Sequence, residues 1–457
     1  MMSPRPFLAF ALLASALPVF GSLTPHNNAN WVYTNKLARE DVPNHLQILE
    51  ADSRLNLEMH PSTVILSGDG RQPYLFCSAQ GTLFCQAQET KPPFRTKDKQ
   101  VYLMRIDSAI SRDGGKSWSR WTHQADHDDV NIEGGMAQLR DGTILALDTF
   151  VMEGKTPGHG IGEIWKSHDD LRTWEGPFWV DFKLPHIAWS GSTNDIGQHE
   201  ASARVHRSLL ELPNGDLLTT MYCRFDGDTA PAAYMPTMLK SRTIIVRSRD
   251  HGSNWAYLAT VGVDSGMGTE GFGEPVLARV DRGVHAGRLI CIMRTGRMLH
   301  QSYSDDNGEH WEHPFPMRLP GIDVYNSARW EKRFGYDPHA PDYVPRDDMI
   351  GSMTDPELIQ MRSGVLVCGF GFRAPEKRYS IDWHAQENGD YIAFSLDGGD
   401  TWSEILQFRS GAPTTHYMGI RESKPGILYV AYDDNIWQMP GNAQGFELDV
   451  RRSGDKP

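Results

Sequence analysis

Short runs of apolar residues, separated by clusters of Gly, Asp, Ser and Pro, follow one another along this 457-residue chain. Runs such as "TIIVRS" (243–248) and "DYIAFS" (390–395) are rich in β-branched and aromatic residues, which favour strands. The Gly, Asp, Ser and Pro clusters between such runs favour tight turns. The pattern therefore predicts an all-β chain built from short strands.

An eight-residue motif joins several of these strands through a polar turn that ends in a tryptophan. Its Ser and Asp side chains bond to their own backbone, and its Gly tolerates a positive φ. The Trp gives the hairpin one large apolar surface to bury. The copies occupy residues 111–118, 167–174, 248–255, 304–311 and 395–402.

A second pattern, strand–turn–strand, follows each copy, and a further strand–turn–strand begins the chain at residues 60–76. One repeating unit therefore contains four strands. Six such units predict a six-bladed β-propeller in a single domain, residues 22–457, rather than a linear stack. The unit at the front has no Asp-containing hairpin, and we expect residues 31–48 to supply its outermost strand and close the ring.

The eight-residue motif resembles the Asp-box of sialidases and their relatives, and its copies extend over most of the chain. The resemblance implies a propeller in which the Asp-boxes lie on the rim, away from the axis. We therefore expect the motif aspartates to close hairpins and to take no part in catalysis.

Composition narrows the possible partners and the compartment. The formal net charge is −13 and no dense Lys/Arg run occurs, so we expect neither nucleic acid nor a membrane as partner. Arg5 followed by an apolar stretch at 7–20 predicts a signal peptide over residues 1–21, and hence a secreted or periplasmic protein. The five cysteines are too scattered for a disulfide framework, and no Cys/His cluster has zinc spacing. We expect a monomer without metal or other cofactor.

The inner strands of a propeller line its axis, where ligands bind. Counting back six residues from the residue before each inner-strand turn reaches an ionisable or phenolic side chain in every unit. These residues are His60, Glu133, His206, Glu274, Asp355 and Tyr417. Such a set in otherwise apolar strands predicts a functional ring, and Arg207 beside His206 is a further candidate for substrate binding.

Arginines follow the second strands at similar depth, at Arg224, Arg294 and Arg373. Guanidinium groups match carboxylate and sulfate geometry, so these residues are candidates for binding an anionic sugar. Pairing with neighbouring carboxylates is the alternative.

Carboxylates and a tyrosine around one axis favour glycoside hydrolysis, which needs a proton donor and a nucleophile or base. "GFGEPVLARV" with Glu274 resembles the sialidase segment that carries a Glu base, and "HYMGIRESKPGILYVAY" with Tyr417 resembles the segment that carries the Tyr nucleophile. Arg294 resembles the second of three arginines that hold the sialic acid carboxylate. The other two arginines are missing from the expected places, which hold Met59-His60-Pro61 and Glu387-Asn388-Gly389.

The general acid has several candidates. The ring alignment favours Glu133 and Asp355. The resemblance to sialidases, which use an Asp from a loop ahead of the first Asp-box, adds Asp98, and Glu200, in a loop before the third inner strand, would suit the exo-arabinanase scheme. A long insertion at 312–352, rich in aromatic residues, arginine and proline, is expected to act as an active-site lid.

The sequence thus predicts a sialidase-like exo-glycoside hydrolase that releases a terminal anionic or deoxy sugar from a glycan. Two alternatives stay open. One is a neutral-sugar exo-hydrolase resembling exo-arabinanases, in which Glu274 is the nucleophile and Tyr417 supports it. The other is a carbohydrate-binding propeller without turnover.

Overall fold

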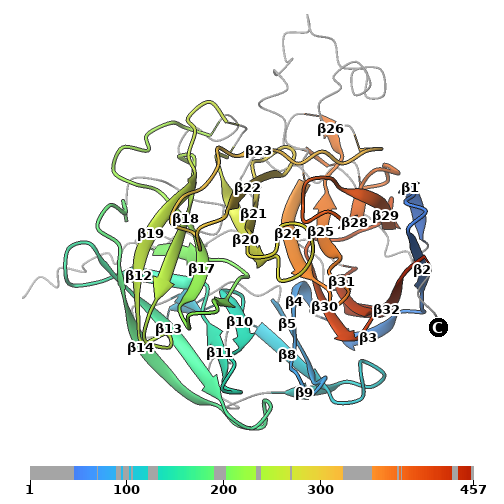
Figure 1. Cartoon of the computed structure of the whole chain (residues 1–457), viewed down its shortest axis with the longest axis horizontal. Coiled ribbons are helices and arrows are strands. Elements are labelled where there is room, and N and C mark those ends of the chain that lie inside the picture. The colour runs from blue at the N-terminus through green and yellow to red at the C-terminus, as the bar shows by residue number, and fades with distance from the viewer. Residues whose placement is uncertain are drawn as a thin grey trace, which may run out of the picture.

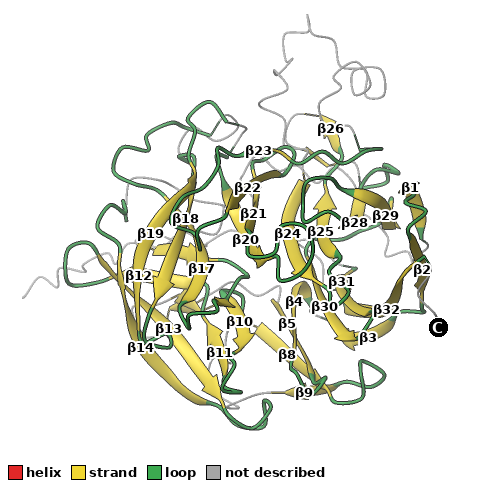
Figure 2. Cartoon of the chain, in the orientation of Figure 1, coloured by secondary structure: helices red, strands yellow, loops and turns green. Residues whose placement is uncertain are grey.

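The structure, a computed structural model, is all-β throughout its described part (Figure 2). This confirms the predicted class. Among the described residues no helix is long and apolar enough to cross a membrane, and no group of three or more His, Cys, Asp or Glu side chains has metal-binding geometry. The described residues are 46–68, 70–88, 94–95, 102–103, 106–121, 132–189, 202–232, 238–267, 270–322, 353–377, 380–381, 383–434 and 441–453.

The strands form mainly antiparallel sheets that surround a central axis (Figure 1), and we divide them into modules numbered in chain order, of which the second and third are joined in one ten-stranded sheet. The first module contains β4 (Arg71–Cys77), β5 (Leu83–Gln88), β8 (Ile106–Ser111) and β9 (Ser119–Trp121). The second contains β10 (Gly135–Gln138), β11 (Ile144–Leu147), β12 (Phe150–Glu153), β13 (His159–Ser167) and β14 (Glu175–Lys183). The third contains β15 (Ser202–Val205), β16 (Leu210–Glu211), β17 (Leu217–Cys223), β18 (Arg242–Ser248) and β19 (Asn254–Gly262).

The later modules follow the same order from the axis outward. The fourth contains β20 (Gly273–Arg279), β21 (Leu289–Arg294), β22 (His300–Ser304) and β23 (Phe315–Pro316). The fifth contains β24 (Met353–Gln360), β25 (Leu366–Phe372), β28 (Gly389–Ser395) and β29 (Ser403–Ser410). The sixth contains β30 (Met418–Lys424), β31 (Ile427–Asp433) and β32 (Ala443–Arg452), and two short hairpins lie outside the modules: β6 (Phe94–Arg95) with β7 (Tyr102–Leu103), and β26 (Pro375–Lys377) with β27 (Ser380–Ile381).

The N-terminal strands complete the sixth module and not the first, and they do so with other residues than the sequence predicted. The unit at the front does contain an Asp-containing hairpin, because the motif at 111–118 joins β8 to β9. β2 (Leu55–Met59) and β3 (Thr63–Leu66) both pair with β32, whereas β1 (Gln47–Glu50) pairs with β29. Of the segment 31–48, residues 31–45 lie outside the described part. Residues 47 and 48 extend the fifth module rather than close the ring.

The predicted inner strand of the first module is corrected in the same way. Residues 63–66 are an outer partner of β32, and β4 lines the axis instead. The exposure of β3 is that of an outer strand, because its first half is exposed, with Val64 at 51%, and only Ile65 and Leu66 are buried. β4 is buried along nearly its whole length, as an inner strand must be.

Apolar clusters between neighbouring modules hold the ring together. Each pair of neighbours shares one: Trp165 packs with Tyr74 of the first module, for example, and Tyr429 of the sixth packs with Leu75 of the first. Polar contacts repeat between inner turns as well. The side-chain oxygen of Gln138 accepts from the Ala79 N–H at 2.7 Å, and the next contacts are Glu211 with Arg140, Gln360 with Asp281 and Glu422 with Arg362.

The eight-residue motifs form compact outer hairpins that satisfy their own polar groups. In the first, Ser111 Oγ donates to Asp113 Oδ1 at 2.8 Å, and Asp113 accepts the Ser117 N–H and hydroxyl at 3.0 and 2.6 Å. The other four aspartates accept equivalent bonds: Asp169, Asp250, Asp306 and Asp397. Trp118 Nε1 donates to the Gly115 carbonyl within its own hairpin. These aspartates are occupied by local structure, as expected.

Candidate active site

A recurrent β-bulge turns side chains from the inner strands towards the axis. Pairing is interrupted at Gln72-Pro73, Glu274-Pro275 and Asp355-Pro356, and the residue before each proline has a positive φ of 52°, 40° and 44°. A residue before proline normally adopts extended geometry with negative φ, so each bulge stores strain on the order of 1–3 kcal/mol. The sequence signal for this bulge is a residue followed by proline before an apolar run, and the six-residue count back from each turn did not use it.

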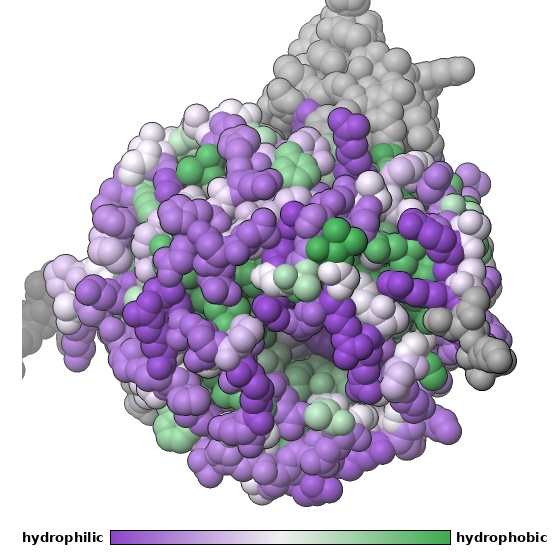
Figure 3. Space-filling model, viewed as in Figure 1, coloured by the Kyte–Doolittle hydropathy of each residue, from purple (hydrophilic) through white to green (hydrophobic). Residues whose placement is uncertain are grey.

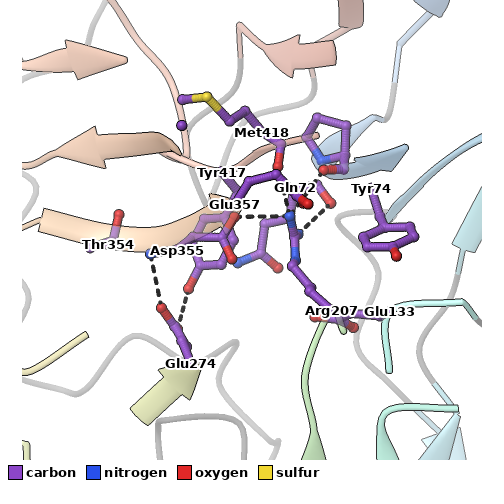
Figure 4. Close-up of polar contacts among 12 residues, drawn as sticks. Gln72, Tyr74, Glu133, Arg207, Glu274, Thr354, Asp355, Glu357, Tyr417 and Met418 are labelled. Carbon is purple, nitrogen blue, oxygen red and sulfur yellow. Dashed lines mark hydrogen bonds and ion pairs between the residues drawn. The ribbon is translucent and has the colours of Figure 1, made fainter. Parts of the chain in front are cut away.

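Glu274 and Tyr417 meet at the centre of the site (Figure 4). Tyr417, which directly precedes β30, donates its hydroxyl to Glu274 Oε1 at 2.5 Å. Arg294, at the end of β21, donates to the same oxygen at 2.8 Å and to Glu270 Oε1 at 2.9 Å. Glu274 Oε2 accepts the backbone N–H of Asp355 at 3.2 Å. The pair predicted from the sequence is therefore brought together across the fourth and sixth modules.

Asp355 and its partners lie beneath this pair and are closed to solvent. Arg207 Nη1 lies 2.9 Å from Asp355 Oδ2, and His206 Nε2 lies 3.6 Å from Oδ1. His206 Nδ1 lies 3.1 Å from the Pro275 carbonyl, an acceptor, so Nδ1 carries the proton. The side chains of Asp355 and Arg207 are 0% exposed, which separates them from the slightly exposed Glu274.

Glu133 lies at the second module, just before β10, with 8% of its surface exposed. Arg204 Nη2 donates to Glu133 Oε1 at 3.0 Å, and Gln88 Nε2 donates to Oε2 at 3.2 Å. Its backbone carbonyl accepts the Arg207 N–H at 2.9 Å. Glu133 is therefore fixed by both neighbouring modules and keeps some contact with solvent.

The other predicted residues are scattered. His60 does not lie on the ring: it follows β2 on the outer side of the sixth module, where its Nε2 is 3.3 Å from Asp449. The one-strand error in the first module explains this, and Gln72 occupies the corresponding axial position. Arg224 follows β17 and Arg373 follows β25; both are buried, and Arg373 Nη2 lies 3.5 Å from the Thr415 carbonyl. Asp98, Glu200 and most of the insertion 312–352 lie outside the described residues.

Four buried side chains of the site were missed from the sequence. Glu270 accepts a hydrogen bond from Arg294, and Arg204 donates one to Glu133. The Tyr222 ring lies against the His206 ring, with the centroids 5.8 Å apart. His416 stacks on Trp383 and lies 2.9 Å from Asn388 Oδ1. Glu270 and His416 each precede an inner strand by a few residues, a position that the count from the turn does not reach.

The electrostatic setting separates the protonation states of the central pair. Burial opposes ionisation of Glu274, but the charge of Arg294 and the hydrogen bond from Tyr417 outweigh it and lower its pKa to about 2. Burial, reinforced by the Glu274 charge, raises the pKa of Tyr417 well above its usual value. Burial lowers the pKa of His206 to about 3. At neutral pH the site therefore holds an ionised Glu274, a neutral Tyr417 and a neutral His206.

Burial also raises the pKa of Asp355 well above its usual value, against the guanidinium of Arg207 and with the help of nearby carboxylates. On the face shown in Figure 3 the surface is mostly hydrophilic and is hollowed near the middle of the ring.

Comparison with known proteins supports the fold. The BNR/Asp-box repeat model matches residues 109–120. A protein of unknown function from Dyadobacter fermentans is 16% identical, with 86% of this chain and 99% of that chain covered and a TM-score of 0.57. An α-L-arabinofuranosidase from Fusarium graminearum, in complex with an iminosugar inhibitor, is 13% identical, with 86% and 98% covered and a TM-score of 0.51. NanB sialidase from Streptococcus pneumoniae is 11% identical, with 85% and 70% covered and a TM-score of 0.48.

A search of curated proteins gave no significant match. The repeat-model match and the first two likenesses confirm the predicted resemblance to Asp-box, sialidase-like propellers at the level of the fold. At these identities they do not reach the substrate or the catalytic residues.

Proposed function

We propose that this chain is a six-bladed β-propeller glycoside hydrolase, with Asp-boxes on its rim, that releases a terminal sugar from a glycan. The observation that carries the proposal is the 2.5 Å hydrogen bond from Tyr417 to an ionised Glu274. A buried carboxylate held beside a phenol is one arrangement that can carry out displacement at an anomeric carbon.

Glu274 is the better nucleophile of the two. A nucleophilic carboxylate must be ionised, and the pKa of Glu274 is about 2. The same low pKa makes Glu274 a weak base towards Tyr417, whose own pKa is raised. Glu274 Oε2 attacks the anomeric carbon while an acid protonates the departing oxygen. Water then hydrolyses the glycosyl ester with retention, and Tyr417 stabilises the carboxylate charge through Oε1.

Glu133 is the acid that this scheme favours. It is partly exposed and fixed by Arg204 and Gln88, whereas the Asp355 side chain has no exposed surface from which to reach a leaving group. Asp355 instead supports Glu274 through its backbone N–H. We keep Arg373 and Arg224 as candidates for binding sugar hydroxyls or charges.

The sugar is neutral in this proposal, and the anionic sugar becomes the second candidate. Arg294 is held by Glu270 and Glu274, and Arg204 by Glu133, so protein carboxylates already occupy guanidinium edges that a sugar carboxylate would need. Export through the signal peptide at 1–21 and a monomeric state remain part of the proposal.

Hydrolysis of a panel of aryl glycosides by the mature chain tests the proposal, with arabinosides, sialosides and uronides included. Release from a neutral glycoside that is lost in Glu274→Gln supports it. Release from an anionic glycoside moves the substrate to the second candidate while leaving the pair in place. Sugar binding without release from any member of the panel would identify a carbohydrate-binding propeller instead.

A further inference from the structure

The segment His206–Arg207 connects one module to all the others. His206 contacts the Pro275 carbonyl of the fourth module and Asp355 of the fifth. The Arg207 N–H donates to the Glu133 carbonyl of the second module. The Arg207 guanidinium reaches the first and sixth modules, where it donates to the carbonyls of Pro73, Gln72 and Met418.

Arg207 also lies against both rings that face the axis here. Its Cζ is 5.4 Å from the centroid of the Tyr417 ring and 5.6 Å from that of Tyr74. The distances fit cation–π contacts, which are strongest where water is excluded. The backbone of Arg207 has a positive φ of 47°, so the chain accepts local strain to place this side chain on the axis.

We propose that Arg207 is a positioning residue that fixes Tyr417 and Glu274 from beneath, and that it does not bind substrate. Two connections carry this inference. Arg207 holds Tyr417 directly, through the ring and through the adjacent Met418 carbonyl at 2.8 Å. It holds Glu274 through Asp355, whose carboxyl pairs with Arg207 while its backbone N–H binds Glu274. The inference corrects the sequence-based role of Arg207 and rests on the proposed function for its kinetic consequence.

The absence of exposed surface decides against substrate binding. The Arg207 side chain is 0% exposed, and its Nη1 and Nη2 atoms already contact the carbonyls and the carboxyl named above. A substrate-binding arginine would raise KM when replaced. A positioning arginine lowers kcat, because a small displacement of reacting groups costs about 10²-fold in rate.

The test uses the full chain and the double variant Arg207→Met/Asp355→Asn, which removes both charges so that neither is left buried alone. Asp355→Asn alone is the first comparison, because it removes only the connection through the Asp355 carboxyl and keeps the backbone N–H and the Arg207 contacts with Tyr417 and Met418. The pair Arg242–Asp228 of the third module, joined at 2.5 Å, gives the second control as Arg242→Met/Asp228→Asn. Should the double variant fail to fold, Arg207→Lys replaces it, since it keeps the charge but loses the planar fork.

Two readouts are needed, one of them independent of activity. On the aryl glycoside that the wild type cleaves, we expect kcat of the double variant to fall about 10²-fold with KM within about threefold. Asp355→Asn should show a smaller fall in kcat, because one of the two connections remains, and the Arg242/Asp228 control should leave kcat unchanged per folded molecule. In a crystal structure of the double variant, the distance between Tyr417 Oη and Glu274 Oε1 should exceed hydrogen-bonding range.

Either of two results would overturn the inference: a rise in KM with unchanged kcat, or a crystal structure in which the bond between Tyr417 and Glu274 is intact. If the wild type cleaves no glycoside at all, the proposed function fails, and the crystallographic distance alone decides the role of Arg207.

Discussion

The outer hairpins and the axial site both depend on aspartate and glutamate side chains, but the two regions satisfy them in opposite ways. In the hairpins, each aspartate is exposed or half-buried and bonds within a few residues of itself, as Asp113 does with Ser111 and Ser117. At the axis, each carboxylate is buried and is held by another module, as Glu274 is by Tyr417. The hairpins are local structure, whereas the site exists only when the ring is assembled.

This difference explains why the repeated motif says much about the fold and little about the chemistry. A hairpin that stabilises itself works equally well in every module, so its sequence repeats. The axial positions must differ from one module to the next, because a catalytic pair needs unlike groups on opposite sides of one bond. Gln72, Glu274 and Asp355 share a bulge but not a side chain.

Glu274→Gln should cause the largest loss of activity and gives the strongest test of the difference between the axial site and the outer hairpins. The amide keeps the shape but loses the nucleophilic charge, so we expect kcat/KM to fall by about 10³-fold. Asp306→Asn in an outer hairpin is the matched control and should leave kcat/KM unchanged per folded molecule. Comparable losses of kcat/KM in both variants would contradict the assignment of catalysis to the axial site and of a purely structural role to the hairpin aspartates.

Tyr417→Phe should have the second largest effect. Glu274 keeps its charge through Arg294 but loses the hydrogen bond at Oε1, so we expect kcat to fall by about 10²-fold. Steady-state kinetics of the purified variant measures this fall.

The dependence of kcat/KM on pH in the wild type gives a separate test of the charge on Glu274. With a Glu274 pKa of about 2, kcat/KM should show no acid limb near pH 4.5 in the wild type. An acid limb at that pH, in protein that remains folded, would mean that Glu274 is not the ionised group.

The sequence predicts the hairpins well because their contacts span only a few residues. The same local reasoning places Glu133, Glu274, Asp355 and Tyr417 around the axis, since each lies a fixed distance from a turn in its own strand. His60 failed because two strand–turn patterns compete near the N-terminus, and only the pairing with β32 shows which is outer. Glu270 and Arg204 were missed because the sequence does not show that they lie beside Arg294 and Glu133 in the folded ring. Arg207 was given a substrate-binding role because the complete burial of its side chain can be seen only in the structure.

Asp250→Ala should act on stability and not on turnover. The substitution removes the bonds from Ser248 Oγ at 2.8 Å and from the Asn254 N–H and side-chain amide at 2.8 and 2.7 Å. Loss of such local caps costs about 1–2 kcal/mol, partly offset because water replaces the bonds at an exposed site. Chemical denaturation should show the change in the free energy of unfolding. A loss of kcat per folded molecule would connect the rim to the site.

Asp113→Asn should have the smallest effect on the protein, a pH-dependent change in Tm that comes from an outer hairpin and not from the axial site. Hydrogen bonds from the Ser117 side chain and backbone lower the pKa of Asp113 to about 2, below the usual range of an aspartate. A depressed pKa stabilises the folded state above the unfolded pKa, and this contribution disappears as pH falls from about 4 towards 2. Asn cannot ionise, so the variant should lose about 1–2 °C in Tm at pH 7 and approach the wild type near pH 2.5. Because Asp113 is exposed, its contribution to folding stability depends on hydrogen bonds inside one hairpin. An equal Tm difference between variant and wild type at both pH values would show that ionisation of Asp113 does not stabilise the hairpin.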